Sequence, residues 1–236
     1  MRREVNINYI TKDKLMVSTD MAKVGCNECM GCHKCCCDMG NSIILDPYDI
    51  MNLYKATGCD FPTLLSNMIT LNIVDGVILP NLAMTANKTF TDKSLGINCC
   101  NFLNEDGRCD IHEYRPGICR LFPLGRIYEN GTFKYFLQPD QCAKENRTKV
   151  KIRNFLDIDN LRAYEEFVTK WHYFLNFVEE CIKKMSVMEN GDIKIKNINM
   201  YILNTFFITK TGEDGFFEEM DRRISIAKKK IELEME

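Results

Sequence analysis

The chain has 236 residues, of which 45% are hydrophobic and 27% are charged, a composition typical of a folded globular protein and not of a disordered chain. Lysine and arginine number 31 and aspartate and glutamate 33, which gives a net charge of -2 and argues against nucleic acid as a partner. Residues 1–25 contain no apolar run of signal-peptide length, and no later stretch approaches the roughly 18 apolar residues of a membrane span. We therefore expect a cytoplasmic protein without a membrane segment.

The thirteen cysteines are the unusual feature of the composition. A chain of this length buries enough surface to fold without disulfides, and cytosolic thiols stay reduced, so the cysteines indicate metal binding or catalysis more than disulfides. Twelve of them lie between Cys26 and Cys142, and Cys181 lies beyond. The composition thus predicts a cysteine-cluster metal-binding domain over residues 1–145 and a helical C-terminal subdomain over residues 146–236 that packs on it.

The first cysteine group has a regular spacing, Cys26-x2-Cys29-x2-Cys32-x2-Cys35-Cys36-Cys37. Each C-x2-C turn brings two sulfurs together, and its repetition can surround a metal with thiolates, as in the run of a bacterial ferredoxin. A ferredoxin run places three residues before its fourth cysteine and a proline after it, whereas Cys35 follows two residues and precedes no proline. The spacing therefore predicts a metal site but not a plain ferredoxin.

Short helices and hairpins are predicted between and around the cysteines. Asp46 and Pro47 read as the N-cap and first residue of a helix that ends at Gly58, and a second short helix is expected from Pro62. Two β-branched and aromatic stretches surround turn dipeptides: residues 71–79 around Asp75-Gly76, and residues 124–137 around Asn130-Gly131. Both predict β-hairpins.

The second cysteine group, together with the first, resembles a known family. It comprises Cys99, Cys100, Cys109, Cys119 and Cys142, within the segments Cys100-Asn-Phe-Leu, Gly107-Arg-Cys109-Asp-Ile-His112 and Arg115-Pro-Gly-Ile-Cys119-Arg120-Leu-Phe-Pro123. With Cys29-x2-Cys32-x2-Cys35-Cys36, these segments resemble the CxxCxxCC or YkgJ family, described as zinc- or iron-chelating and shared with flagellin lysine N-methylases. The resemblance covers about residues 26–142.

The resemblance implies a set of metal ligands, which are Cys29, Cys32, Cys35, Cys36, Cys100, Cys109, Cys119 and Cys142. Zinc and a [4Fe-4S] cluster each take four protein ligands, so eight thiolates imply two sites or one site with reserve thiols. Cys26, Cys37 and Cys99 exceed the family pattern, and the sequence leaves open whether they also ligate. Cys59 and Cys181 read as buried thiols.

The residues after 145 are expected to contribute to the packing of the fold. The basic stretch from Lys144 to Arg153 is expected to be a solvated connection. Residues 157–185 carry apolar side chains at steps of three and four, which predicts one long helix that buries Leu161, Val168, Trp171, Leu175 and Val178. Residues 197–209 are expected to form a buried helix or strand, and residues 215–235 a charged amphipathic helix. The fold class expected is α+β, with a loop-rich cysteine-cluster core, short helices, two hairpins and a helical C-terminal part.

Adjacent cysteines bear on the choice of metal. Neighbouring side chains point to opposite faces of an extended segment and diverge by about 100° in a helix, so Cys35 and Cys36 are not expected to bind one small zinc ion together. They could reach two centres or different atoms of one cluster. Thiolates suit both zinc and iron–sulfur. We favour one or two [4Fe-4S] clusters, with zinc as the first alternative and a redox or storage thiol cluster as the second.

Three polar residues lie next to the second cysteine group in the sequence: His112, Arg115 and Arg120. They are candidates for a catalytic role or another role besides metal ligation. The arginines could offset the negative charge of a multi-thiolate centre or bind an anionic substrate, and the sequence does not separate these roles. His33 reads as an exposed turn residue and His172 as a packing or surface residue.

The function expected is that of an iron–sulfur protein with a redox or cluster-dependent role. The alternatives are a zinc-binding structural protein and an enzyme similar to a lysine N-methylase, the last implied only by the resemblance. The sequence contains no C-x3-C-x2-C run, no G-x-G-x-x-G and no H-E-x-x-H, so no common cofactor or metallohydrolase motif supports an enzyme. Whether the chain is an enzyme, and which protein partner or substrate it uses, stay open.

Overall fold

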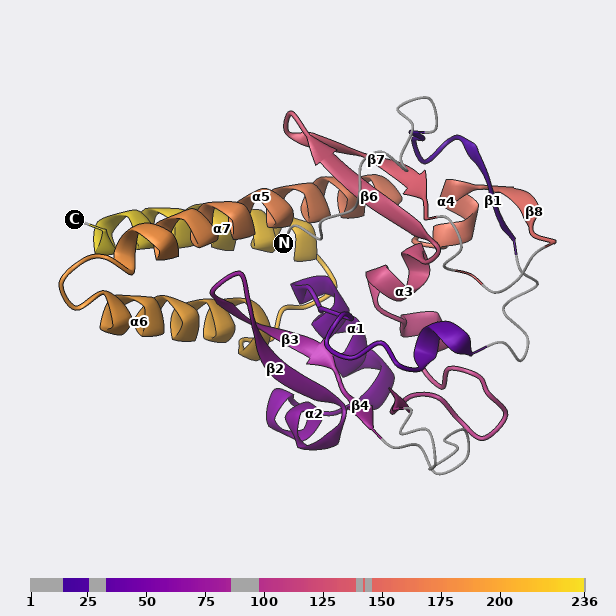
Figure 1. Cartoon of the computed structure of the whole chain (residues 1–236), viewed down its shortest axis with the longest axis horizontal. Coiled ribbons are helices and arrows are strands. Elements are labelled where there is room, and N and C mark those ends of the chain that lie inside the picture. Colours follow the sequence, from indigo (N-terminus) through magenta and orange to yellow (C-terminus); the bar gives the residue numbers. More distant parts are fainter. Residues whose placement is uncertain (1–14, 26–32, 86–97, 139–141, 143–145, 236) are drawn as a thin grey trace.

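The computed structural model describes residues 15–25, 33–85, 98–138, 142 and 146–235 and has an α+β architecture (Figure 1). The helices are α1 (Pro47–Thr57), α2 (Phe61–Asn67), α3 (Gly117–Leu121), α4 (Ile152–Leu156), α5 (Leu161–Met185), α6 (Gly191–Leu203) and α7 (Phe216–Glu234), with the 3-10 turns η4 (Lys34–Cys36) and η5 (His112–Tyr114) and the π turn η6 (Asn204–Ile208). The strands pair antiparallel: β1 (Met21–Gly25) with β8 (Thr148–Lys151), β2 (Ile69–Val74) with β3 (Val77–Leu82), β4 (Met84–Thr85) with β5 (Cys99–Cys100), and β6 (Leu124–Glu129) with β7 (Thr132–Leu137).

The capping residues of α1 confirm its predicted bounds. The Asp46 side chain accepts a 2.9 Å bond from the Asp49 N–H, and Asp49 accepts one of 3.0 Å from the Asp46 N–H, which forms a capping box. Gly58 ends the helix in the left-handed region, with φ 68°. The second helix, α2, starts at Phe61, one residue before the expected Pro62, because Asp60 caps it by accepting from Thr63 N–H.

Both predicted hairpins are present in the expected register. Val74 pairs with Val77 across Asp75 and Gly76, and Glu129 pairs with Thr132 across residues 130 and 131. All four turn residues have positive φ, which is the requirement of a two-residue type I′ turn.

The long helix α5 supplies the largest buried face of the molecule. It buries Val168, Trp171, Leu175 and Val178, as expected, whereas Leu161 is only half-buried. The helix also begins later than residue 157. Residues 152–156 form the separate helix α4, Asp157 lies in the left-handed region at φ 52°, and Asn160 then caps α5 by accepting from Ala163 N–H.

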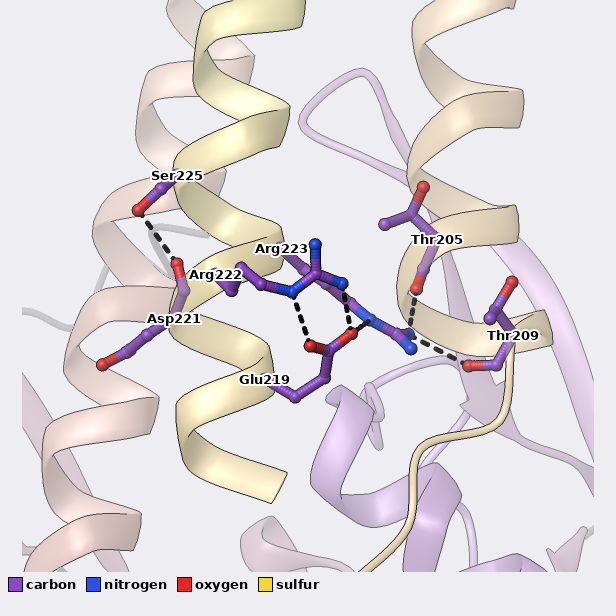
Figure 2. Close-up of polar contacts among 7 residues, drawn as sticks. All are labelled: Thr205, Thr209, Glu219, Asp221, Arg222, Arg223 and Ser225. Carbon is purple, nitrogen blue, oxygen red and sulfur yellow. Dashed lines mark hydrogen bonds and ion pairs between the residues drawn. The ribbon is translucent and has the colours of Figure 1, made fainter. Parts of the chain in front are cut away.

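The remaining C-terminal segments are helical. Residues 197–209 lie in α6 and the π turn η6, and the charged helix α7 lies side by side with α5 (Figure 1). Figure 2 shows how Arg223 of α7, which is 8% exposed, donates to the carbonyls of Thr205 and Thr209, at 2.5 and 3.0 Å. Glu219 accepts 2.7 Å bonds from Arg223 and Arg222, so the buried guanidinium is paired.

The basic stretch after residue 144 is not a plain connection. Thr148–Lys151 forms β8 and pairs with β1, a strand that was not predicted. Alternation explains the pairing, because Ala22 and Val24 of β1 are buried while Met21 and Lys23 are exposed. Together with Leu121, Leu124, Tyr135, Ile152 and Leu156, these two residues form a small second core.

The main hydrophobic core draws on both sides of residue 145. It contains apolar residues from α1, α2 and the β2–β3 hairpin together with those of α5, α6 and α7. The boundary near residue 145 stays a prediction, since a shared core neither requires nor forbids two units. No helix in the described residues is both long and apolar enough to cross a bilayer.

Candidate metal centre

Five predicted ligands come from four separate segments at the edge of the main core. Cys35 and Cys36 lie in η4, Cys100 in β5, Cys109 in the loop before η5, and Cys119 in the short helix α3. All five are free thiols, with Cys100 buried and the others half-buried. Backbone bonds tighten the loop around Cys109, since His112 N–H donates to the Cys109 carbonyl and Leu103 bridges to Cys109.

The electrostatic coupling of these thiols shows that they lie near one another. Burial is the largest cause of a raised pKa at Cys100, to about 11, and at Cys119, while negative charge on Cys35 and Cys109 raises both further. The pKa of Cys109 is raised by burial and by Cys35 as well. The structure therefore brings together Cys35, Cys36, Cys100, Cys109 and Cys119, although up to 84 residues separate them in sequence.

The adjacent cysteines of η4 do not diverge as expected. The Cys36 thiol donates a hydrogen bond to the Cys35 sulfur, which is the largest cause that lowers the pKa of Cys35 to about 7 and raises that of Cys36. The 3-10 turn closes with a 2.8 Å bond from Cys36 N–H to the His33 carbonyl, and His33 has a positive φ of 22°. The two sulfurs therefore lie side by side in this tight turn, whereas the expectation that Cys35 and Cys36 do not bind one zinc ion together stays a prediction.

A disulfide joins Cys37 and Cys99, 62 residues apart. Disulfides were the weaker interpretation of these cysteines, and the sequence left open whether Cys37 and Cys99 bind metal; in the structure the two form a disulfide. The physical reason is backbone proximity: Cys37 and Cys99 are partners in an antiparallel bridge, and their Cα atoms are 3.9 Å apart. Spacing in the sequence carries no information about which cysteines pair in this way.

The segment that carries Cys119 is held by a buried carboxylate. Asp49 is 2% exposed, and its Oδ1 accepts a 2.7 Å bond from the N–H of Gly117, the first residue of α3. Burial is the largest cause that raises the pKa of Asp49 to about 6. On the other side of Gly117 a Cβ atom would overlap the Tyr164 hydroxyl, so only glycine fits between α1 and α5. Neither Asp49 nor Gly117 was expected as a site residue. The pattern Asp-Pro-x-Asp does indicate that Asp49 takes part in the capping of α1.

The two candidate arginines have different surroundings. Arg120 is 9% exposed and donates to the backbone carbonyls of Arg115, Leu156, Asp157 and Glu113, which ties α3 to η5 and to the end of α4. Arg115 donates to the His112 carbonyl at 2.8 Å and contacts the exposed His112 ring. Burial lowers the pKa of Arg115, while Cys109 and Cys119 act in the opposite direction, which places its charge near these thiols.

The other residues that the sequence singled out lie on separate segments of the chain or outside the residues that the structure describes. Cys26, Cys29 and Cys32 fall outside the described residues, Cys142 is half-buried, and Cys181 is buried on α5. Cys59 is half-buried, not fully buried as expected, and its thiol donates to the Thr57 carbonyl. His172, predicted to be a packing or surface residue, packs: its ring stacks on that of Tyr128, with 3.8 Å between the ring centroids.

The donor chemistry of the gathered thiols fits a soft metal centre. Within the described parts of the chain, no three His, Cys, Asp or Glu side chains are grouped so that they could hold one ion. Cys100 nevertheless lies in the main core with Cys36, Cys109 and Cys119 packed against it, and the charge of Arg115 acts on Cys109 and Cys119. Thiolates with this kind of nearby positive charge suit iron–sulfur clusters and zinc.

The comparison with protein families agrees with this donor set. Residues 28–144 match the family model CxxCxxCC, whose title is "Putative zinc- or iron-chelating domain". The matched range contains all eight cysteines that the resemblance implied as ligands. Searches of curated proteins and of solved structures found no match.

Proposed function

We propose that this chain carries a [4Fe-4S] cluster, because residues 28–144 match the CxxCxxCC family model of a zinc- or iron-chelating domain. In this proposal the ligands come from Cys35, Cys36, Cys100, Cys109 and Cys119, completed by Cys29, Cys32 and Cys142. The observation that carries the proposal is that free thiols from four segments affect one another's pKa, with Cys100 in the main core and Cys36, Cys109 and Cys119 packed against it. A bound cluster would accept or donate one electron, in keeping with a redox or cluster-dependent role.

The number and arrangement of the thiols favour a cluster over a single zinc ion. Zinc in a structural site takes four ligands tetrahedrally, and five described thiols already exceed that number. A cluster binds its thiolates through different iron atoms, so it accommodates sulfurs that do not meet at one point. The hydrogen-bonded pair Cys35 and Cys36 then supplies one ligand and one donor to a ligand sulfur, or two ligands. Zinc remains the alternative.

The surroundings of the thiols fit a centre with net negative charge. Thiolates and cluster sulfides together carry more negative charge than the irons neutralise, so a nearby cation lowers the cost of burial. Arg115 supplies that cation, because its charge interacts with both Cys109 and Cys119. Phe102 and Ile111, each two residues from a proposed ligand, are buried in the main core and supply an apolar environment next to Cys100 and Cys109.

Anaerobic purification followed by metal and sulfide analysis tests the proposal. The protein should be brown, contain iron and acid-labile sulfide in equal amounts, and lose both after Cys119→Ser. Cys181→Ser is the matched control, since this free thiol lies on α5 and outside the family match; it should leave iron and sulfide unchanged. Colourless protein that contains zinc without sulfide would replace the cluster by the zinc alternative. Unchanged metal content in Cys119→Ser would remove the second cysteine group from the site.

A further inference from the structure

The disulfide between Cys37 and Cys99 lies directly beside the proposed ligands. Cys37 follows Cys36 in the chain, and Cys99 precedes Cys100. Neither disulfide cysteine belongs to the ligand set that the family resemblance implies. The covalent link therefore joins the two cysteine groups at the point where each contributes a thiol to the metal centre.

The backbone around the disulfide forms a small three-stranded arrangement. Cys99 pairs with Thr85 on one side and with Cys37 on the other, and Asp38 N–H donates to the Asn98 carbonyl at 2.6 Å. Among the described contacts, these are the backbone bonds that hold the Cys37 segment against β5. Few bonds join the two groups, so the disulfide makes a large contribution to holding Cys36 beside Cys100.

We propose that the Cys37–Cys99 disulfide is a redox-controlled clamp that sets the metal affinity of the adjacent thiol site. The inference rests on the proposed function, because it concerns the regulation of that same site. With the disulfide closed, Cys36 and Cys100 are held together before the metal arrives, so binding does not have to fix the Cys37 segment against β5. With the disulfide open, the ordering of that segment opposes binding.

The exposure of the two cysteines determines how a reductant opens the clamp. Cys99 is 0% exposed, whereas Cys37 is half-buried, so an incoming thiolate reaches the Cys37 sulfur first. A small dithiol reductant attacks that sulfur, the Cys37–Cys99 bond breaks, and the Cys99 sulfur leaves and takes a proton. The second thiol of the reductant then displaces Cys37 and forms the disulfide of the reductant. Two electrons and two protons pass to the protein.

Zinc titration of the oxidised and reduced full-length chain tests the clamp, with Zn²⁺ as a redox-inert probe of the thiols. The metal-free protein is prepared anaerobically in both states, and the reductant is removed before titration against a chromophoric chelator. Differential alkylation with mass spectrometry reports the state of Cys37 and Cys99 independently. We expect the oxidised protein to bind zinc about ten-fold more tightly than the reduced protein, because the reduced protein has to order the Cys37 segment when it binds the metal.

Variants separate the clamp from a general effect of the reductant. Cys37→Ser/Cys99→Ser should bind zinc as weakly as the reduced wild type and should not respond to reductant. Cys59→Ser/Cys181→Ser removes two free thiols away from the clamp and should keep the difference between the two states. If Cys37→Ser/Cys99→Ser does not fold, the zinc affinities of the oxidised and the reduced wild type still test the clamp.

The outcomes distinguish this inference from the proposed function. Equal zinc affinity in the two states, tighter binding after reduction, or alkylation of Cys37 and Cys99 without reductant would overturn the clamp while leaving the metal site in place. The last two results would make these cysteines ligands instead. Absence of zinc and iron binding in both states would overturn the proposed function and the clamp with it.

Discussion

The Oδ1 atom of Asp49 accepts a hydrogen bond of 2.7 Å from the backbone N–H of Gly117, 68 residues later in the chain. The same carboxylate closes the capping box of α1 through its Oδ2 atom. One buried side chain thus fixes the start of α1 relative to the start of α3, which carries Cys119. The position of a proposed ligand therefore depends on a carboxylate in the hydrophobic core.

The first prediction concerns the pH dependence that this burial produces. The pKa of Asp49 is raised from 3.8 to about 6 in the folded protein, so folding favours its protonated form. Its contribution to stability is full below pH 3.8 and is lost as the pH rises through 6. Between pH 4 and pH 7 the unfolding free energy of the wild type should fall relative to that of Asp49→Asn, by on the order of 3 kcal/mol. Urea unfolding at a series of pH values measures the difference.

Asp60 provides the matched control for this experiment. It caps α2 as Asp46 and Asp49 cap α1, but it is exposed, and its hydrogen bonds from Thr63 lower its pKa. The sign is therefore opposite: its contribution is present above its unfolded pKa and is lost as the pH falls. Asp60→Asn should reduce stability near neutral pH and have little effect in acid. Parallel pH profiles for wild type and Asp49→Asn would contradict the role assigned to burial.

The second prediction concerns the space around Gly117. A Cβ atom at this position overlaps the hydroxyl of the buried Tyr164, so Gly117→Ala must displace either α3 or α5. Overpacking of this kind costs about 1–3 kcal/mol, and a displaced α3 should also lower the metal content of the folded protein. Tyr164→Phe removes the overlapping oxygen, so the double variant should recover part of both losses. Strictly additive effects in this double-mutant cycle would show that the two side chains do not meet.

The sequence predicted those parts of the fold that depend on short-range signals. The Asp46-Pro47 start of α1, the Gly58 end and the two turns with positive φ are all determined by residues within a few positions of one another. The apolar face of α5 was predicted in the same way, from apolar residues three and four positions apart. Its start at residue 157 was wrong, because the left-handed conformation of Asp157 follows from the packing of α4 and not from the local pattern.

The parts that could not be predicted depend on pairing between distant segments. β1 and β8 are separated by more than a hundred residues, and neither strand is apolar enough to be recognised alone. The ligand set came from the family resemblance and stays a prediction, which metal analysis of the cysteine variants tests. The disulfide partner of Cys37 could not be deduced, because thirteen cysteines allow many pairings and the backbone decides among them.

The third prediction tests the packing of α5. Trp171 is 6% exposed, and its ring contacts those of Phe174, Phe206 and Phe207 within 6 Å. Trp171→Ala should lower the unfolding free energy by about 3–5 kcal/mol while leaving the metal content per folded molecule near normal, because α5 carries none of the proposed ligands. Thermal unfolding and metal analysis of the same samples measure both. Val187→Ala, at a position that is 87% exposed, is the control and should change neither quantity. A stable Trp171→Ala protein would refute the packing role.

The last prediction separates Arg115 from Arg120, which the sequence could not do. The Arg120 guanidinium donates hydrogen bonds to four backbone carbonyls. Arg120→Gln should therefore lower the unfolding free energy by roughly 2–4 kcal/mol, because it leaves buried acceptors without donors. Its effect on the reduction potential of a bound cluster should be smaller than that of Arg115, because Arg115, and not Arg120, is among the main causes that act on the pKa of Cys109. Arg115 has its charge near Cys109 and Cys119. Arg115→Gln should shift the potential downward, because a nearby positive charge favours the reduced, more negative centre.

Electrochemical titration of the two variants, with unfolding measured on the same samples, distinguishes the roles. Arg162→Gln serves as the control, because this arginine is 90% exposed in its ion pair with Glu166 and lies on the first turn of α5. It should change neither the potential nor, by more than about 0.5 kcal/mol, the stability. A downward shift in Arg120→Gln equal to that in Arg115→Gln would mean that Arg120 also acts through its charge. An unchanged potential in Arg115→Gln would contradict the electrostatic role assigned to Arg115.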